Sequence, residues 1–347
     1  MQRAKLDIVF GKLTKTIPNF ETLFGKSFLI TGANGLIGSV LVDFLLYLNT
    51  EFQANCSIIA MSRSLEKLEK RFSQYAGNTK LSLVAHDVSN PFPLLPFSDY
   101  TIHTAAQAYP NLFSQDPAGT IIGSVLGTLN VLNFARKSKF SRVLFVSSGE
   151  VYGELDSNMY GIKENESGFI DINSVRSCYP NGKRVSENLC RAYGVQYGQD
   201  VVIARPSHVY GPFIGEKDNR ASSEFFRLAA QGNSLVLKSE AKQLRSYTYV
   251  FDCISAIFSI LTSGNSGEAY NVANPDSTIT ISGFAELLAD IAHVELRRDY
   301  LESSVEFSPI SNAVLNSDKL IALGWKPLFT MEQGLAHSLD VYHELFD

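Results

Sequence analysis

The 347-residue sequence predicts an α/β fold, in which a doubly wound parallel sheet is followed by a smaller α/β lobe. Two observations carry this prediction. Apolar runs of strand length alternate with helical patterns through the first two thirds of the chain. A glycine-rich turn separates the first apolar run from the first helical pattern. Alternation of this kind places helices on both faces of a sheet whose strands run in the same direction.

The elements follow from these patterns in chain order. Strand-like apolar runs lie at residues 28–30, 56–61, 81–86, 100–104, 142–147 and 201–205. Helical patterns lie at residues 36–48, 64–75, 119–138 and 179–197. Beyond residue 205 the pattern is less regular, and we expect loop and short helix at 212–246, strands at 247–250, 268–273 and 278–281, and helices at 252–262 and 282–293.

Composition excludes several classes of protein. The net charge is −5 and no basic run occurs, so we expect neither nucleic acid nor an anionic membrane as a partner. The apolar stretches are shorter than a membrane span, and residues 1–24 lack the unbroken apolar core of a signal peptide. Four separated cysteines and six histidines show no metal-ligand spacing, so we expect reduced thiols, no metal and a cytoplasmic protein.

The glycine-rich turn at residues 31–38 predicts a phosphate site. Gly32 permits a tight turn, Gly35 lets the backbone approach a pyrophosphate, and Gly38 lets the helix pack closely on the strand. The free N–H groups and the dipole at the start of that helix favour an anion. The alternative is a plain tight turn between two core elements, but the flanking strand and helix favour a dinucleotide site.

This interpretation divides the chain into three parts. Residues 1–24 form an N-terminal extension, helical or irregular, that packs on the first domain. Residues 25–210 form a dinucleotide-binding domain. Residues 211–347 form mainly a substrate-binding lobe, with some segments returning to the first domain.

A candidate catalytic group comes next. Tyr179 and Lys183 are four residues apart at the start of a predicted helix, so they share one face. A nearby ammonium favours the phenolate, and we expect it to lower the pKa of Tyr179 toward working pH. The phenol could then serve as general acid or base for a sugar hydroxyl or ketone. Ser147 and Ser148 end the fifth strand, where a hydroxyl could bond the reacting oxygen or cap the turn.

Further motifs follow the glycine turn in order: Asp87-Val88, His103-Thr104-Ala105-Ala106, residues 147–153, Tyr179-x-x-x-Lys183, Arg205-Pro206, residues 209–212, Arg245-Ser246-Tyr247, residues 267–272 and residues 323–327. With these motifs, the chain from Ser27 onward resembles the extended short-chain dehydrogenase/reductases, in particular the nucleotide-sugar epimerase/dehydratase family. The resemblance implies a Rossmann-type sheet, a nucleotide-sugar substrate and a homodimer.

The same resemblance implies roles for individual residues. Those implied to contact the cofactor are Gly32, Asn34, Gly35, Leu36, Ile37, Gly38, Asp87, Val88, Ala105, Ala106, Tyr179, Lys183, Pro206 and Val209. Those implied to act in catalysis are Ser148, Tyr179 and Lys183, joined by Glu150. Arg245 is implied to contact the diphosphate or the sugar of the substrate.

The end of the second strand departs from an NAD site. Such a site has a carboxylate there to hold the ribose hydroxyls. This chain has Ser62 and Arg63, with Lys67 one turn later. Arginine suits a ribose phosphate, so NADP(H) is the favoured cofactor and NAD(H) the alternative. The other interpretation of Arg63 is a solvated side chain at a helix start.

A second departure concerns the reaction. Glu150 stands where dehydratases and decarboxylases of the family carry a glutamate. Gly149 precedes it, where dehydratases have an acid and decarboxylases a serine that delivers a proton, and a glycine delivers none. Residues 176–187 nevertheless resemble the UDP-glucuronate decarboxylases.

We therefore expect hydride transfer at the sugar C4. The favoured function is an NADPH-dependent reductase of a dTDP-4-keto-6-deoxyhexose, in the synthesis of surface polysaccharide precursors. The main alternative is a UDP-glucuronate decarboxylase, followed by a nucleotide-sugar 4-epimerase or 4,6-dehydratase. An alternative of another class is a catalytically silent sensor or scaffold that binds the dinucleotide. The intact group of Ser148, Tyr179 and Lys183 argues against that last alternative, because a sensor needs no proton donor.

Overall fold

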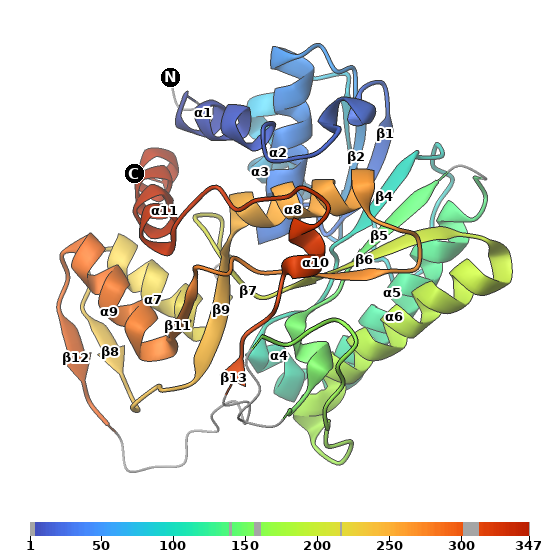
Figure 1. The fold of residues 1–347 in the computed structure, drawn as a ribbon. Helices are drawn as coiled ribbons and strands as arrows, with labels where there is room; N and C mark the ends of the chain where they lie inside the picture. Colours follow the sequence, from blue (N-terminus) through green and yellow to red (C-terminus); the bar gives the residue numbers. More distant parts are fainter. Residues whose placement is uncertain (1–3, 139–140, 156–160, 216, 301–311, 347) are drawn as a thin grey trace.

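The computed structural model describes residues 4–138, 141–155, 161–215, 217–300 and 312–346 (Figure 1). Its centre is a seven-stranded sheet in the order β10-β6-β5-β4-β1-β2-β3, with every neighbouring pair parallel. The strands are β1 (Ser27–Thr31), β2 (Ser57–Ser62), β3 (Leu81–Ala85), β4 (Tyr100–His103), β5 (Arg142–Val146), β6 (Asp200–Pro206) and β10 (Ala269–Val272). The predicted α/β fold with a doubly wound parallel sheet is confirmed.

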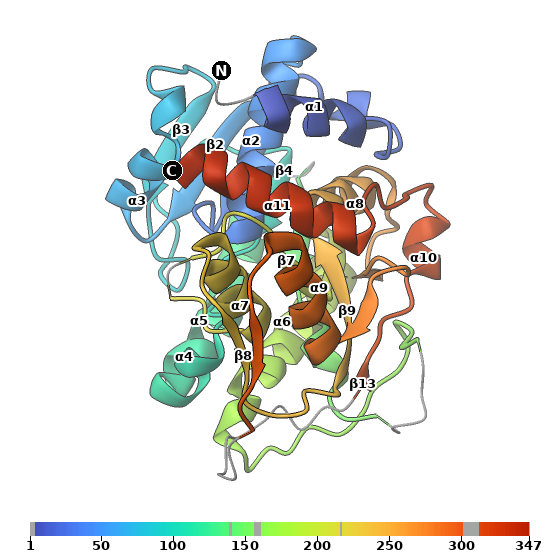
Figure 2. The ribbon, with the colours of Figure 1, turned by 90° about the vertical axis from the view of Figure 1, so that its left-hand side faces the viewer.

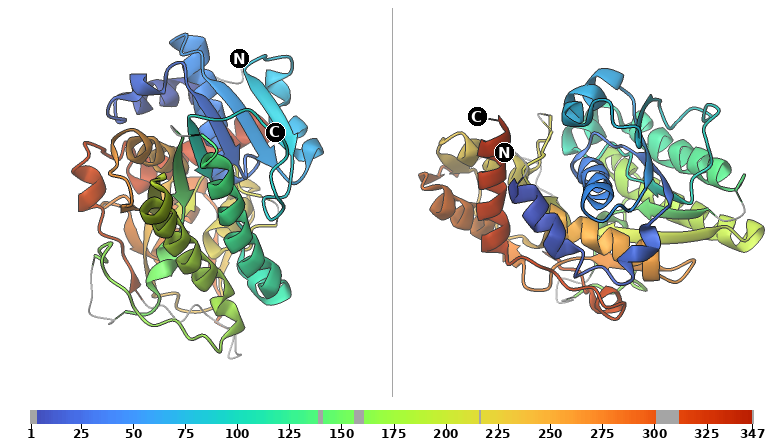
Figure 3. Two further views of the ribbon diagram at one scale, coloured as in Figure 1. Left: turned by 90° about the vertical axis from the view of Figure 1, so that its right-hand side faces the viewer. Right: turned by 90° about the horizontal axis from the view of Figure 1, so that it is seen from above.

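Helices cover both faces of the sheet, so each face contributes to its own apolar core (Figures 1 and 3). The main ones are α2 (Leu36–Glu51) and α8 (Val250–Ser263) on one face, and α5 (Pro117–Ala135) and α6 (Cys178–Tyr197) on the other. Along β5, Leu144 and Val146 belong to the first core, and Val143 and Phe145 belong to the second. This alternation follows from the two-residue period of a strand.

The N-terminal residues pack on the first of these cores. Helix α1 (Ala4–Leu13) contacts α2 and α8, and its Phe10 ring lies 5.6 Å from the ring of Phe44. Leu13 is fully buried in the same core. Of the predicted extension at 1–24, residues 1–3 lie outside the described residues.

Every strand and helix that the sequence predicts is present, with ends that differ by a few residues. The predicted helix at 64–75 is divided into α3 (Leu65–Arg71) and the 3₁₀-helix η2 (Ser73–Tyr75). The predicted strand at 247–250 begins earlier, as β9 (Leu244–Tyr249). Elements that the sequence did not indicate are α4 (Pro110–Gln115), β7 (His208–Tyr210), β8 (Leu235–Leu237), β12 (Leu296–Arg298), β13 (Asn312–Ala313), α10 (Asp318–Ile321) and α11 (Met331–Phe346).

The remaining elements form a smaller lobe around β9. This strand pairs with β7, β13 and β11 (Thr278–Thr280). Helices α7 (Ala221–Ala230) and α9 (Ile281–Ala292) pack together, and α11 crosses beside them (Figure 2). Stacked rings fill the interior, with 4.7 Å between the centroids of Tyr247 and Phe284.

Two late segments return to the main sheet. Strand β10 pairs with β6 as the seventh strand, and α8 packs against β5, β6 and β10. The lobe is therefore tied to the sheet by more than one crossing of the chain. The assignment of residues 25–210 and 211–347 to cofactor and substrate stays a prediction.

Helix α5 is long and apolar enough to cross a membrane by length and composition alone. This is weak evidence, because the core helix of a soluble protein passes the same test. Here α5 packs against α6, β4 and β5.

Candidate active site

A cleft of about 2030 Å³ opens at the carboxyl ends of the parallel strands, between the main sheet and the smaller lobe. This is the edge at which doubly wound sheets bind ligands. The cleft is lined by every residue that the sequence assigned to the cofactor, to catalysis or to the substrate. The structure therefore brings these residues together, while their individual roles stay predictions.

The glycine turn has the close packing that a phosphate site needs. Gly32 has φ +70°, and a Cβ there would lie 2.7 Å from the Ala105 backbone nitrogen. A Cβ on Gly38 would overlap the Gly32 carbonyl oxygen. Helix α2 starts at Leu36, and its N-cap Gly35 offers no side-chain cap. The first N–H groups of α2 thus line the cleft without helical partners, and the turn fits a dinucleotide pyrophosphate.

The side chain of Arg63 is exposed and follows β2 directly, at the rim of the same cleft. Ser64 caps α3 by accepting a 3.3 Å hydrogen bond from the Lys67 backbone N–H, which fixes where Arg63 leaves the strand. Beside the end of β2, the turn that follows β3 is held by a 2.9 Å bond from Asn130 to the Val88 carbonyl. The Asp87 carboxylate accepts a bond from the backbone of its own turn.

Ser148, Tyr179 and Lys183 meet at the centre of the cleft. Ser148 is the N-cap of the 3₁₀-helix η3 (Gly149–Tyr152), and its hydroxyl lies near enough to the Tyr179 phenol to lower the pKa of Tyr179. The buried Lys183 ammonium lies 5.9 Å from the centroid of the Tyr179 ring. It donates a 2.8 Å hydrogen bond to the carbonyl oxygen of Val146, at the end of β5.

The expected direction of the Tyr179 pKa shift is wrong for this structure. Burial, and after it the Glu150 carboxylate, raise the pKa of Tyr179 to about 12. The nearby Ser148 hydroxyl and the charges of Arg220 and Arg176 act in the opposite direction. Burial also lowers the pKa of Lys183 to about 8. The phenol is therefore protonated at neutral pH, as a general acid must be.

The polar wall beside Tyr179 carries more positive than negative charge. Glu150 accepts hydrogen bonds of 3.1 and 3.3 Å from Arg176. Arg176 had no role of its own in the sequence-based predictions. Arg245 is only 3% exposed, and burial lowers the pKa of its guanidinium. The Arg245 guanidinium donates a 2.9 Å hydrogen bond to the backbone carbonyl oxygen of Leu244. Two guanidinium groups face one carboxylate here, an arrangement that can bind an anionic group of a ligand.

Three further residues of the site had no signal in the sequence. Phe113 of α4 stacks on the Tyr179 ring at 4.7 Å with an angle of 14° between the planes. Arg220 lines the cleft beside Tyr179 and is held by a 2.5 Å bond to Asp218. His208 also lines the cleft, and burial lowers its pKa to about 3, so its imidazole is neutral. Each depends on a contact between distant segments, which no local pattern reveals.

Gly149 has an apolar neighbour. A Cβ at this position would lie 3.2 Å from Cδ1 of Leu315 and 3.5 Å from the carbonyl oxygen of Pro206. The backbone N–H of Leu315 donates a 3.1 Å bond to the Ser246 hydroxyl, which holds that leucine in place. A side chain that starts at residue 149 would therefore meet an apolar group, Leu315, which would have to move slightly to admit it.

Comparisons with known proteins agree with this arrangement. The model of the NAD dependent epimerase/dehydratase family matches residues 28–273. UDP-glucuronic acid decarboxylase 3 of Arabidopsis thaliana is 32% identical over 310 residues, which cover 88% of this chain and 86% of the relative. Among solved structures, the dTDP-glucose 4,6-dehydratase of Streptomyces venezuelae with NAD bound has a TM-score of 0.77 and 23% identity, over 92% of this chain and 97% of that one.

Another similar solved structure contains NADPH in place of NAD. RMD from Pseudomonas aeruginosa, complexed with NADPH, has a TM-score of 0.70 and 28% identity, over 91% of this chain and 98% of that one. Structures similar to this chain thus hold either NAD or NADPH. The family match spans most of the chain, from the glycine turn to β10. The chain belongs to the NAD dependent epimerase/dehydratase family, among the extended short-chain dehydrogenase/reductases.

Proposed function

We propose that the chain is an NADPH-dependent reductase that acts at C4 of a 4-keto-6-deoxy sugar linked to a nucleotide, of the dTDP-hexose type. The observation that carries this proposal is the glycine at position 149, which has no proton-donating side chain and where a Cβ would meet Leu315. Reduction of a C4 ketone needs one proton, on the C4 oxygen. Decarboxylation and dehydration need a further proton transfer at a carbon atom, and Gly149 has no side chain that could provide it.

In the proposed reduction, each residue of the site has its own role. The bound cofactor supplies the hydride. The Tyr179 hydroxyl donates the proton to the C4 oxygen, and Ser148 shares a hydrogen bond with that oxygen. Lys183 holds the ribose and keeps α6 on the end of β5 through its bond to Val146. Phe113, stacked on Tyr179, excludes water from one side of the phenol.

The proposed preference for NADPH depends on Arg63. A guanidinium at the end of β2 can pair with a ribose phosphate, and Lys67 lines the same rim. A carboxylate that would hold two ribose hydroxyls is absent from this position. A reductase also releases its oxidised cofactor after each turnover, which is consistent with the exposed position of Arg63 at the rim of the cleft.

Decarboxylation of UDP-glucuronate is the second candidate. It is favoured by the identity of 32% to a UDP-glucuronic acid decarboxylase and by the two guanidinium groups that face Glu150. An anionic sugar carboxylate would suit that excess positive charge. Epimerisation and dehydration rank below it, because the curated relative of 32% identity is a decarboxylase.

We propose further that the protein is a cytoplasmic homodimer. Ile121, Ile122 and Leu126 on α5 are 41%, 50% and 39% exposed, although α5 is otherwise a core helix. A second copy of the chain packed on the outer surface of α5 and α6 would bury these side chains. Sedimentation should give a dimer, and Ile122→Glu should shift it toward monomer.

Mass spectrometry of reaction products tests the proposed reaction. The substrates are dTDP-4-keto-6-deoxyglucose, UDP-glucuronate, UDP-glucose and dTDP-glucose, each with and without added NADPH. A product two mass units heavier than the keto sugar, formed only with NADPH, supports the reductase. A product that has lost carbon dioxide, formed from UDP-glucuronate without added NADPH, supports the decarboxylase instead.

A further inference from the structure

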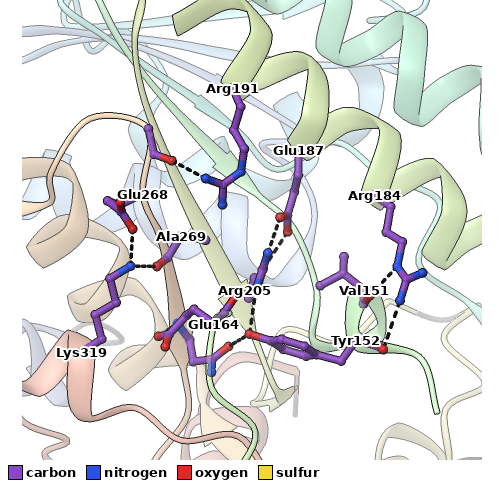
Figure 4. A network of polar contacts seen from close by, with 12 residues as sticks. Val151, Tyr152, Glu164, Arg184, Glu187, Arg191, Arg205, Glu268, Ala269 and Lys319 are labelled. Atoms are coloured by element: carbon purple, nitrogen blue, oxygen red, sulfur yellow. Dashed lines mark hydrogen bonds and ion pairs between the residues drawn. The ribbon is translucent and has the colours of Figure 1, made fainter. Parts of the chain in front are cut away.

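Helix α6 carries a second set of polar side chains next to its catalytic residues (Figure 4). Arg184 follows Lys183 directly and is half-buried, while its guanidinium points to the turn that begins at Ser148. It donates hydrogen bonds of 2.6 Å to the carbonyl oxygen of Val151, 3.1 Å to that of Tyr152 and 2.9 Å to that of Gly168. One side chain thus binds three backbone oxygens from two segments of the chain.

Those three oxygens belong to the structure that positions Ser148. Val151 and Tyr152 lie in η3, of which Ser148 is the N-cap. The Gly168 segment runs beside it, since the Gly168 backbone N–H donates a 2.7 Å bond to the Tyr152 carbonyl. Without Arg184, the carbonyl oxygens of Val151 and Gly168 would lose a charged donor in a partly buried place.

A buried ion pair holds the other end of the same turn. Arg205 of β6 donates bonds of 2.6 and 2.9 Å to the carboxylate of Glu187, one turn further along α6 (Figure 4). It also donates a 2.9 Å bond to the Tyr152 hydroxyl, which in turn donates to Asn271 of β10. The far end of η3 is therefore fixed by this pair, and Arg184 holds the middle of the turn.

We propose that Arg184 is a positioning residue that holds the Ser148 hydroxyl in place beside the Tyr179 phenol. This inference rests on the proposed hydride-transfer function, in which Tyr179 and Ser148 share the reacting oxygen. Its chain of contacts runs from Arg184 through the carbonyls of η3 to Ser148. Arg184 itself contacts neither cofactor nor substrate in this account.

Ser148 is one of several groups that set the pKa of Tyr179. The charged groups that face the phenol are the Glu150 carboxylate of η3, the Arg176 guanidinium of η4 (Val175–Ser177), the Arg220 guanidinium ahead of α7 and the Lys183 ammonium of α6. The nearby Ser148 hydroxyl stabilises the phenolate and lowers the pKa of Tyr179. Displacement of that hydroxyl should therefore raise the pKa of Tyr179.

The test compares two arginines of the same helix. Arg184→Ala should lower kcat by about 10- to 10²-fold, the range that a misplaced catalytic group produces, with little change in KM. Arg191→Ala is the matched control: Arg191 is exposed and donates one 2.8 Å bond to the Gly267 carbonyl, far along α6, so its variant should keep the wild-type kcat and KM.

Two further variants separate position from charge. Arg184→Lys keeps the positive charge, but its single nitrogen cannot occupy both the Nε position that bonds Val151 and the Nη2 position that bonds Tyr152 and Gly168, so it should remain impaired. Full recovery in Arg184→Lys would overturn the proposal, because charge alone would then account for the effect. On a Ser148→Ala background, Arg184→Ala should cost less than twofold more, since the group that it positions is already gone. Two fully additive losses would contradict an action through Ser148.

A measurement without substrate keeps the inference apart from the proposed function. Backbone hydrogen exchange of residues 147–153 should rise in Arg184→Ala and stay at the wild-type rate in Arg191→Ala. Unchanged exchange in Arg184→Ala would overturn the inference even if no sugar were turned over. If exchange rises but no nucleotide sugar reacts with the wild-type protein, the proposed function fails and the positioning contact stands.

Discussion

The Lys183 ammonium donates its hydrogen bond to the Val146 carbonyl oxygen, 2.8 Å away, rather than to the Tyr179 phenol. This bond joins the start of α6 to the end of β5, where the turn with Ser148 also begins. The lysine thereby ties the helix that carries Tyr179 to the strand that leads to Ser148. In this structure it does not make the phenol more acidic, because burial dominates the pKa of Tyr179.

Tyr179→Phe should abolish turnover while the cofactor still binds. Only the proton-donating hydroxyl is lost, and a phenyl ring can keep the 4.7 Å stacking contact with Phe113. The expected fall in kcat is roughly 10²- to 10⁴-fold, the usual contribution of a general acid. Steady-state rates and NADPH fluorescence titration measure the two effects. Activity above about a tenth of wild type would show that another group donates the proton.

Arg63→Asp should shift the cofactor preference from NADPH toward NADH. The change removes a partner for a ribose phosphate and provides an acceptor for ribose hydroxyls. Dissociation constants of both cofactors, measured for the wild type and the variant, test this. Lys80→Asp is a suitable control, because Lys80 lies before β3 and does not line the cleft. An unchanged ratio of the two constants would mean that Arg63 only faces solvent.

Arg245→Ala should weaken substrate binding and leave cofactor binding intact. Arg245 lies on β9 in the smaller lobe and is buried at the wall of the cleft that faces Glu150. A lost charged hydrogen bond to substrate costs about 1.5–3 kcal/mol. Calorimetric titrations with nucleotide sugar and with NADPH separate the two effects. Weaker NADPH binding with unchanged sugar affinity would contradict the assignment of residues 211–347 to the substrate.

Gly149→Ser should destabilise the fold by about 1 kcal/mol, at the low end for overpacking. The new Cβ would lie 3.2 Å from Cδ1 of Leu315, which must then move. Leu315→Ala alone should also destabilise, through the cavity that it leaves. The double variant should be more stable than the sum of the two losses predicts, as urea unfolding can measure. Additive losses would show that the two positions do not share this space.

The sequence predicted the parts of the fold that have a local signal. Strands β1 to β6 are apolar runs, and even β10, which joins the sheet from far along the chain, carries such a run. The missed elements are mostly short: β7 has three residues and β13 has two. A strand of that length has no periodicity of its own, and its pairing with β9 decides its conformation.

At the site, the sequence indicated the residues that lie within motifs and missed those that depend on contacts between distant segments. The glycine turn, Ser148, Tyr179 and Lys183 have fixed spacings within motifs, and the structure gathers them in one cleft. The stacking of Phe113 on Tyr179 and the approach of Leu315 to Gly149 join distant segments, so no motif contains them. The direction of the Tyr179 pKa shift was wrong for the same reason, since the sequence shows the nearby lysine but not the burial.

The most direct test of the central claim is the stoichiometry of cofactor and product. A reductase oxidises one NADPH for each 4-keto-6-deoxy sugar reduced, so the absorbance of the reduced nicotinamide must fall in proportion to product. A decarboxylase returns its hydride to the sugar and consumes no net cofactor. We predict stoichiometric loss of NADPH with dTDP-4-keto-6-deoxyglucose and no carbon dioxide from UDP-glucuronate. Release of carbon dioxide from UDP-glucuronate without added cofactor would contradict the reductase and leave the family assignment unchanged.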